Sequence, residues 1–221
     1  MVVIHIKEIS LRVLAFLIGI LIASTVMATE EPKYVLLDKS ESFELRAYAP
    51  QIVAEVKVDG DLDAASTQGF RLIAAYIFGK NQVSEKIAMT APVGIESSDQ
   101  NKGAKIAMTA PVAIESNKSP DNAGNQWTVS FVMPAEYTLA SLPKPLNPQV
   151  KIREVPAEKK AVITFSGFYN EEKVQEKTQA LRDWIKIKNL KPIGEPQFAR
   201  YNPPWTLPFM RRNEVMIQVL D

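Results

Sequence analysis

The 221-residue sequence contains no cysteine and only one histidine, His5. Without cysteine the chain cannot form disulfides, zinc–thiolate sites, iron–sulfur clusters or a thiol nucleophile. Histidine is a common ligand of zinc and haem iron, and it is the usual base of hydrolase triads. Because His5 lies in a segment that we expect to be removed, the working protein has no imidazole. These absences exclude most familiar active sites.

The first 28 residues have the layout of a secretory signal peptide. Lys7 and Arg12 precede an apolar run from Val13 to Ala23, and small residues follow up to Ala28. An uncleaved anchor is the less favoured interpretation, because the uncharged stretch 13–29 has 17 residues, the lower limit for crossing a bilayer. We therefore predict cleavage after Ala28, a periplasmic or secreted mature chain 29–221, and no stable membrane insertion after cleavage.

Neither sign of charge is in excess. The chain has 26 basic and 25 acidic side chains, and the leader removes two bases and one acid, which leaves 24 of each. A neutral protein lacks the basic face that nucleic acids require, so we expect no nucleic-acid partner. Hydrophobic residues make up 46% of the chain, which is typical of a folded globular protein. We expect a single domain and a monomer.

Hydrophobic periodicity predicts two long helices, at about 61–78 and 171–188. Asp61 or Asp63 caps the first and Asn170 caps the second. Alternating segments before and after each helix predict strands. The halves, about 34–133 and 149–220, each have the order strand, strand, helix, strand, strand. The pattern predicts an α+β fold made of duplicated ββαββ units, with helices outside a largely antiparallel sheet.

An exact local repeat interrupts the first half. Lys86–Ser97 recurs as Lys105–Ser116, and the copies differ only at Gly94 and Ala113. Two copies are too few for a solenoid, so we interpret them as a local duplication of one strand. We predict that both copies are extended, joined by turn residues, and that only one holds the original place in the sheet.

Four motifs occur in the order found in one known family: Ala65–Asn81, Lys86–Val93, Tyr201–Trp205 and Arg211–Val215. Together they resemble the SOUL haem-binding proteins over almost the whole mature chain. The resemblance implies a distorted antiparallel barrel-like sheet flanked by two helices, related to bacterial effector-binding domains. It also implies non-covalent binding of haem or porphyrins. The chain departs from the family in its tandem block and its lack of a mature histidine.

The first helix is apolar on two sides, so either a flat apolar ligand or neighbouring loops must cover it. We predict that an apolar planar ligand such as haem or another tetrapyrrole packs there without a metal-ligating histidine. The candidate binding residues are Phe70, Ile73, Ala74, Ile77, Met89, Met133 and Tyr201. The methionines serve equally as core filler. Tyr201 is a candidate oxygen ligand or hydrogen-bonding lid, and a place at a sheet edge is the alternative.

Two other classes of function stay open. A small hydrolase of the related effector-binding fold could use Glu154 or Glu214 as its acid–base group. A protein-interaction module could use Phe70 and Ile77 of the first helix as a docking surface. We favour binding without catalysis. Arg211 and Arg212 suit ligand carboxylates, but we expect Glu214 or backbone carbonyls to satisfy them locally.

Overall fold

A computed structural model describes residues 29–82, 103–117 and 126–220. The expected signal peptide and the first copy of the repeat, Lys86–Ser97, lie outside these residues, so the predictions about them stay predictions. Among the described helices, none is long and apolar enough to cross a membrane.

Nine of the described strands form one antiparallel sheet, and two short strands form a separate ribbon. The first part of the chain contains β1 (Tyr34–Ser40), β2 (Phe43–Tyr48), β3 (Gln51–Asp59), α2 (Leu62–Ile77), β4 (Asn81–Gln82), β5 (Val112–Ser116) and β6 (Gln126–Val132). The second part contains β7 (Lys144–Pro145), β8 (Lys151–Val155), β9 (Glu158–Phe165), α3 (Glu171–Ile187), β10 (Lys191–Arg200), a 3-10 turn η1 (Pro208–Met210) and β11 (Asn213–Leu220).

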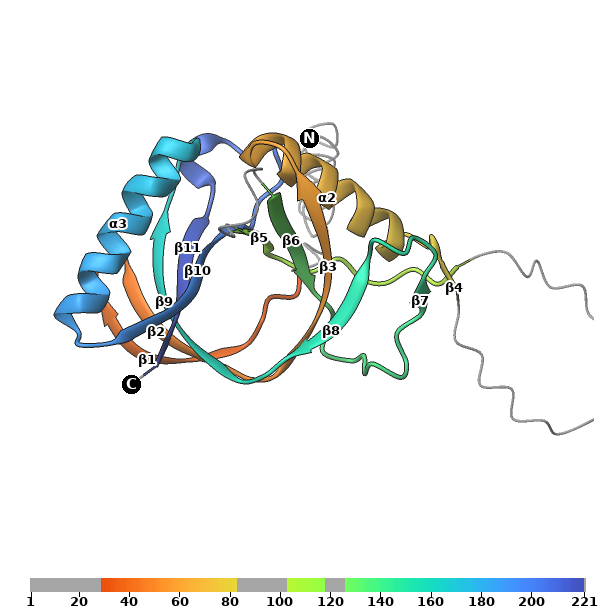
Figure 1. Cartoon of the computed structure of the whole chain (residues 1–221), viewed down its shortest axis with the longest axis horizontal. Coiled ribbons are helices and arrows are strands. Elements are labelled where there is room, and N and C mark those ends of the chain that lie inside the picture. Colours follow the sequence, from red (N-terminus) through yellow and green to blue (C-terminus); the bar gives the residue numbers. More distant parts are fainter. Residues whose placement is uncertain (1–28, 83–102, 118–125, 221) are drawn as a thin grey trace, which may run out of the picture.

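The large sheet is strongly curved, and both helices lie on its convex side (Figure 1). Its strand order is β1-β2-β9-β11-β10-β5-β6-β3-β8. Helix α2 packs on β3 and β6, and α3 packs on β9, β10 and β11. The predicted α+β class with two flanking helices is confirmed. The barrel-like sheet is corrected to an open one, because β1 and β8 are its two edges and do not pair.

The two expected halves share this one sheet. Strands β10 and β5 pair at its centre, β11 and β9 follow on one side, and β6 and β3 follow on the other. Strand β2 of the first half pairs with β9 of the second, and β8 of the second half pairs with β3 of the first. Strands of the two halves are therefore interleaved within the sheet. That the halves are copies of a single ββαββ unit stays a prediction.

Both helices begin at the residues that the sequence indicates. The Asp61 side chain accepts a hydrogen bond from the Ala64 N–H at 2.8 Å, and the Asn170 side chain accepts one from the Lys173 N–H at 2.8 Å. These contacts satisfy backbone donors that the first turn of a helix leaves free. Helix α2 ends before Gly79, whose positive φ of 108° suits a residue without a Cβ.

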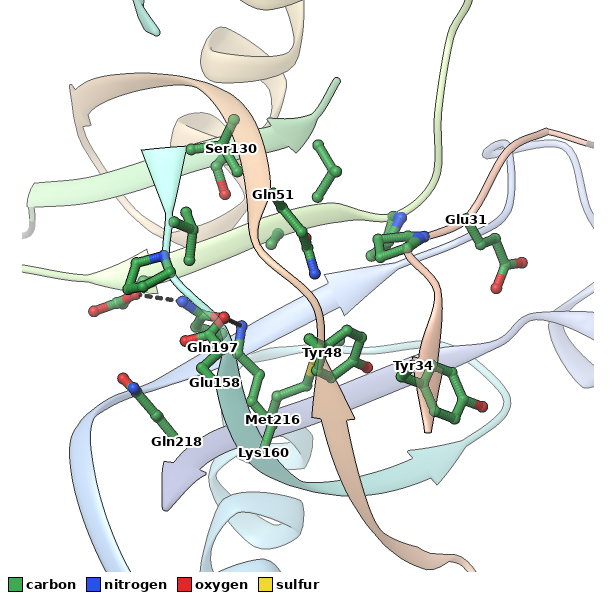
Figure 2. A pocket seen from close by; sticks show the side chains of 18 of the residues that line it. Glu31, Tyr34, Tyr48, Gln51, Ser130, Glu158, Lys160, Gln197, Met216 and Gln218 are labelled. Atoms are coloured by element: carbon green, nitrogen blue, oxygen red, sulfur yellow. Dashed lines mark hydrogen bonds and ion pairs between the residues drawn. The ribbon is translucent and has the colours of Figure 1, made fainter. Parts of the chain in front are cut away.

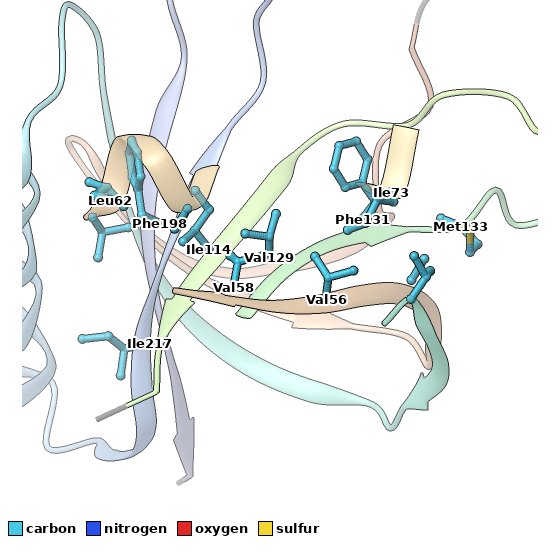
Figure 3. Packing of buried hydrophobic residues seen from close by; sticks show 14 of the residues in the cluster. Val56, Val58, Leu62, Ile73, Ile114, Val129, Phe131, Met133, Phe198 and Ile217 are labelled. Carbon is cyan, nitrogen blue, oxygen red and sulfur yellow. The ribbon is translucent and has the colours of Figure 1, made fainter. Parts of the chain in front are cut away.

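The apolar side chains of the sheet and helices meet in one core on the convex side (Figure 3). Val129 of β6 marks the closest approach of α2 to the sheet. A Cβ added to Gly69 would lie 2.4 Å from Val129 Cγ2, which is far inside van der Waals contact. The missing side chain at position 69 therefore lets α2 pack closely on β6.

The second copy of the repeat supplies a central strand. Strand β5 pairs with both β10 and β6. The predicted extended run, Ile106–Ile114, forms a strand only from Val112 onward. Upstream of it, the backbone donors bind elsewhere, since the N–H of Ile106 donates to Ile77 and that of Ala110 to Glu30.

Strand β10 begins at Lys191, although alternation in the sequence predicts a strand only over Gln197–Tyr201. The sequence pattern does not predict the first part of β10, because it contains Pro192, Gly194 and Pro196, and proline and glycine are unusual in strands. The pairing with β11 shifts register between Ile193 and Gln197, so this part of β10 is irregular.

Candidate functional site

The sheet face opposite the helices is polar. Along β11, Val215, Ile217 and Val219 belong to the core under α3, while Met216 and Gln218 line a cavity on the other face. Side chains alternate between faces with a period of two in a strand. The curvature that wraps the sheet around its helices therefore gathers the alternate, polar residues on the concave side.

A cavity of about 300 Å³ opens on this concave face (Figure 2). Its lining includes Tyr34, Tyr48, Gln51, Gln197, Met216 and Gln218. These residues come from strands of both halves of the chain. We refer to it as the polar cavity.

Hydrogen bonds fix one wall of the polar cavity. Lys160 Nζ contacts a Glu158 carboxylate oxygen at 2.8 Å and donates to Gln197 Oε1 at 2.9 Å. Gln197 Nε2 in turn donates to Glu115 Oε2 at 2.8 Å. The amide of Gln197 is thus held in one orientation between a cation and a carboxylate.

A buried ion pair lies next to this cavity. Both terminal nitrogens of Arg46 donate to Glu214, each at 3.0 Å, and neither side chain is more than 2% exposed. Glu214 also accepts from Tyr201 at 2.6 Å and from Arg212 Nε at 3.0 Å. Such a bidentate, fully hydrogen-bonded pair is the arrangement that a buried charge requires.

The pair keeps both groups charged at neutral pH. Burial alone would raise the pKa of the Glu214 carboxyl, but the hydrogen bonds and charge of Arg46 outweigh burial and hold that pKa below its ordinary value. Burial likewise opposes the charge on Arg46, and contact with Glu214 raises the pKa of Arg46 above its ordinary value. Glu214 is therefore an acceptor and not a proton donor.

Tyr201 is held as a neutral phenol. Burial and the charge of Glu214 raise the pKa of the Tyr201 hydroxyl far above its ordinary value. The Arg212 guanidinium lies 3.8 Å from the centre of the ring. A tyrosinate ligand of iron needs the opposite shift of pKa. Of the two roles predicted for Tyr201, this environment favours the hydrogen bond over the oxygen ligand.

A second cavity, of about 370 Å³, adjoins the first and is mostly apolar. Its lining includes Pro50, Ile52, Val132, Met133, Pro134 and Tyr137. Gln51 and Val132 line both cavities. We refer to the second as the apolar cavity. Of the predicted binding residues that the structure describes, Met133 is the one that lines it.

The structure separates the other predicted residues. Ile73 and Ile77 are fully buried and Ala74 is 7% exposed, because this side of α2 packs on the sheet. A ligand does not reach Ile73 or Ile77 in this arrangement. Phe70 is 39% exposed and lies on Phe131, with 5.7 Å between the ring centres. Met89 lies outside the described residues.

The two carboxylates considered for catalysis lie in different environments. Each Glu214 oxygen already accepts hydrogen bonds from two or more donors. Glu154 is exposed at the edge of the apolar cavity. Among the described residues, no group of three His, Cys, Asp or Glu side chains could hold a metal ion.

The local use predicted for the two arginines is confirmed. Arg211 Nε donates to the Thr206 carbonyl at 2.8 Å, and another guanidinium nitrogen donates to the Pro204 carbonyl at 2.6 Å. Arg212 pairs with Glu214 and, at 2.8 Å, with Glu31. These contacts hold the loop after β10 against the sheet.

Sequence reasoning did not find the polar cavity. Its signal was present in β2, where Glu44, Arg46 and Tyr48 alternate with Phe43 and Leu45. The apolar residues of such a strand predict the face that packs in the core, and the alternate polar residues predict the opposite face. Only the curvature of the folded sheet shows that these polar sets meet.

Fold and cavities together define a class: an α+β protein with helices on one face of an open antiparallel sheet and ligand-sized cavities on the other. Comparison with known families gives the particular one. The SOUL heme-binding protein profile matches residues 29–102 and 95–218, which together span most of the 221-residue sequence. The chain belongs to the SOUL heme-binding protein family, as its motifs predict.

Two relatives support this assignment, and two solved structures have a similar fold. Heme-binding protein 2 of Homo sapiens and that of Mus musculus are each 30% identical over 179 residues, covering 80% of this chain and 77% of the relative. The EcmrR C-terminal domain has a TM-score of 0.53 at 10% identity, covering 85% of this chain and 98% of that one. A hydrolase from Listeria innocua has a TM-score of 0.52 at 10% identity, covering 83% and 94%. At such identities the likeness shows the fold alone.

Proposed function

We propose that this protein is exported and binds haem or another tetrapyrrole non-covalently, without a histidine ligand and without catalysing a reaction. Membership of the SOUL family supports the class of ligand. The sequence after Ala28 contains neither histidine nor cysteine, so the strongest protein ligands for haem iron are missing. The binding energy must then come mainly from burial of the macrocycle.

The observation that carries the proposed site is the apolar cavity around Met133. Its lining of proline, aliphatic and tyrosine side chains suits an apolar ring, since ligand sites are mostly apolar with a few polar groups. Met133 offers a thioether, a weak ligand that haem iron accepts, and Tyr137 offers a phenol. Bound iron would report its axial ligand through its absorption spectrum. Phe70 is the member of the predicted α2 set that stays accessible.

Titration of the mature chain 29–221 with haem and with metal-free protoporphyrin tests this proposal. We expect a saturable one-to-one complex with each, of similar affinity, because apolar burial dominates. A large side chain at the exposed rim, Ala135→Trp, should block the cavity and weaken both by roughly tenfold or more. Met133→Leu should change the haem spectrum only if sulfur binds the iron.

Met216→Leu is the matched control, because it removes a thioether from the polar cavity and leaves the apolar one intact. If Ala135→Trp leaves both affinities unchanged while the protein binds haem, the site lies elsewhere and exposed Phe70 becomes the next variant. Haem bound no more tightly than by an unrelated apolar protein would overturn the function itself.

Export rests on the layout of the first 28 residues. We propose a periplasmic or secreted monomer whose first residue is Thr29. Mass spectrometry of the exported fraction should give that N-terminus, and gel filtration should give a single-chain mass. A full-length chain in the membrane fraction would contradict the proposal.

A further inference from the structure

The polar cavity contains one carboxylate that no cation of the described residues balances. Within that part of the chain, Glu31 pairs with Arg212 and Glu158 pairs with Lys160, each at 2.8 Å. Of the cations that line the cavity, Arg153 pairs with Glu55 at 2.8 Å and Lys160 pairs with Glu158 as above. Glu115 alone among these lining charges has no ion-pair partner there, so the cavity carries a net negative charge.

The environment of Glu115 leaves one of its oxygens available. Oε2 accepts the hydrogen bond from Gln197, and Oε1 has no hydrogen-bond partner within the described residues. Lys160 lies on the other side of the Gln197 amide, where it contacts Glu158. The fixed amide therefore keeps this cation from Glu115, and the free oxygen stays an acceptor for a donor from outside.

Apolar and aromatic groups line one part of the same cavity. Tyr48 and Met216 line the cavity together with Gln197 (Figure 2), and Val53 adds a buried aliphatic side chain to its wall. Tyr34 packs against Tyr48 with 5.4 Å between ring centres, so the two rings form one surface. An aromatic ring packs favourably on such a surface and beside a thioether.

We propose that the polar cavity binds an aromatic amine, with its ammonium group at Glu115 and its ring against Tyr48 and Met216. A charge-assisted hydrogen bond to a carboxylate is shorter and stronger than a neutral one, which favours the amine over an alcohol. This site differs from the tetrapyrrole site in its lining and its charge, so each proposal stands or fails without the other.

Three probes of one shape test the charge requirement: phenethylamine, 2-phenylethanol and phenylacetate. Each is titrated into the mature chain at neutral pH, and binding is followed by NMR chemical shifts. We expect the amine to bind roughly tenfold more tightly than the alcohol, which lacks the charge. Phenylacetate should bind most weakly, because its carboxylate meets Glu115.

Glu115→Gln should remove the preference, with the affinity for phenethylamine falling about tenfold to that of the alcohol. The substitution keeps an oxygen that can accept from Gln197. Glu172→Gln is the matched control, because it removes the same charge from an exposed position on α3 and should leave binding unchanged.

Equal affinity for the amine and the alcohol in the unaltered protein would overturn the proposal, and this comparison needs no variant. Glu115→Gln that keeps both its thermal unfolding transition and full affinity for phenethylamine would also overturn it. Shifts confined to signals from the apolar cavity would show that the amine binds elsewhere, which equally contradicts the proposed site.

Discussion

The two faces of the sheet are formed by the same strands, but one face is apolar and the other is polar. The convex face packs valine, isoleucine and phenylalanine against two helices, and its central residues are fully buried. The concave face holds ion pairs, amides and tyrosines around a cavity. Alternation along each strand makes both faces from one segment. A single substitution in a strand should therefore affect either the apolar packing or the polar cavity, depending on which face of the sheet its side chain occupies.

Helix α2 gives the largest expected contrast. Ile77 is fully buried and Phe70 is 39% exposed, although both were predicted to face a ligand. Ile77→Asp loses apolar packing worth about 2–5 kcal/mol and buries a carboxylate at a further cost of several kcal/mol. That total approaches the roughly 5–15 kcal/mol stability of a typical domain. We expect Ile77→Asp to abolish cooperative thermal unfolding, while Phe70→Ser keeps it.

Calorimetry or circular dichroism on both variants measures this contrast. A folded Ile77→Asp protein with weakened haem binding would support the prediction from the sequence that Ile77 faces the ligand. A Phe70→Ser protein that does not fold would show that the exposed side of α2 also carries the fold.

The concave face has its own critical pair. Glu214→Leu removes both hydrogen bonds of the buried Arg46 to Glu214 and leaves Glu44 as its remaining ion-pair partner, which should cost up to about 3–5 kcal/mol of unfolding free energy. Replacing both, as Arg46→Met with Glu214→Leu, should cost less than the single change, because no buried guanidinium then lies beside an apolar side chain. Urea denaturation of the three proteins gives the comparison. A double variant less stable than Glu214→Leu would contradict this account.

The sequence predicted the convex face far better than the concave one. The starts of both helices and most of the strands follow from periodicity and from the capping side chains Asp61 and Asn170. Packing on the sheet needs only a local apolar pattern, which the chain shows directly. By contrast, Arg46 and Glu214 are 168 residues apart, and no local pattern predicts that they meet.

The candidate binding residues lie in different environments. Met133, Ile73 and Ile77 all belong to the core, and of these three Met133 also lines a cavity. An apolar stripe has the same sequence whether a ligand or a sheet covers it. Helix α2 approaches β6 closely at Gly69, which leaves no room for a ligand between Gly69 and Val129. That approach depends on the tertiary structure, so helix periodicity did not reveal it.

Gly69→Ala gives a smaller effect on the convex face. The added methyl would lie 2.4 Å from Val129 Cγ2, so α2 or Val129 must move. Such overpacking costs about 1–3 kcal/mol, offset in part by the better helix propensity of alanine, about 1 kcal/mol. Adding Val129→Ala should relieve the clash, so the double variant should lose less than the sum of the two single changes. Strict additivity in urea denaturation would show that the two residues do not touch.

The smallest expected effect is a dependence of stability on acid pH that comes from the concave face. The pKa of Glu214 is held below its ordinary value in the folded protein, because the hydrogen bonds and charge of Arg46 outweigh the effect of burial. The unfolded chain therefore binds a proton at Glu214 before the folded chain does as the pH falls. Its stabilising contribution is present in full above the ordinary pKa of the carboxyl, which the unfolded chain retains, and is lost as the pH falls through the lowered pKa of the folded state. Urea denaturation at a series of pH values should show a steeper acid decline for the unaltered protein than for Glu214→Gln, which cannot titrate there. Glu172→Gln, on the convex side, should keep the steep decline. Identical slopes in all three proteins would mean that the Arg46–Glu214 pair does not set the acid stability.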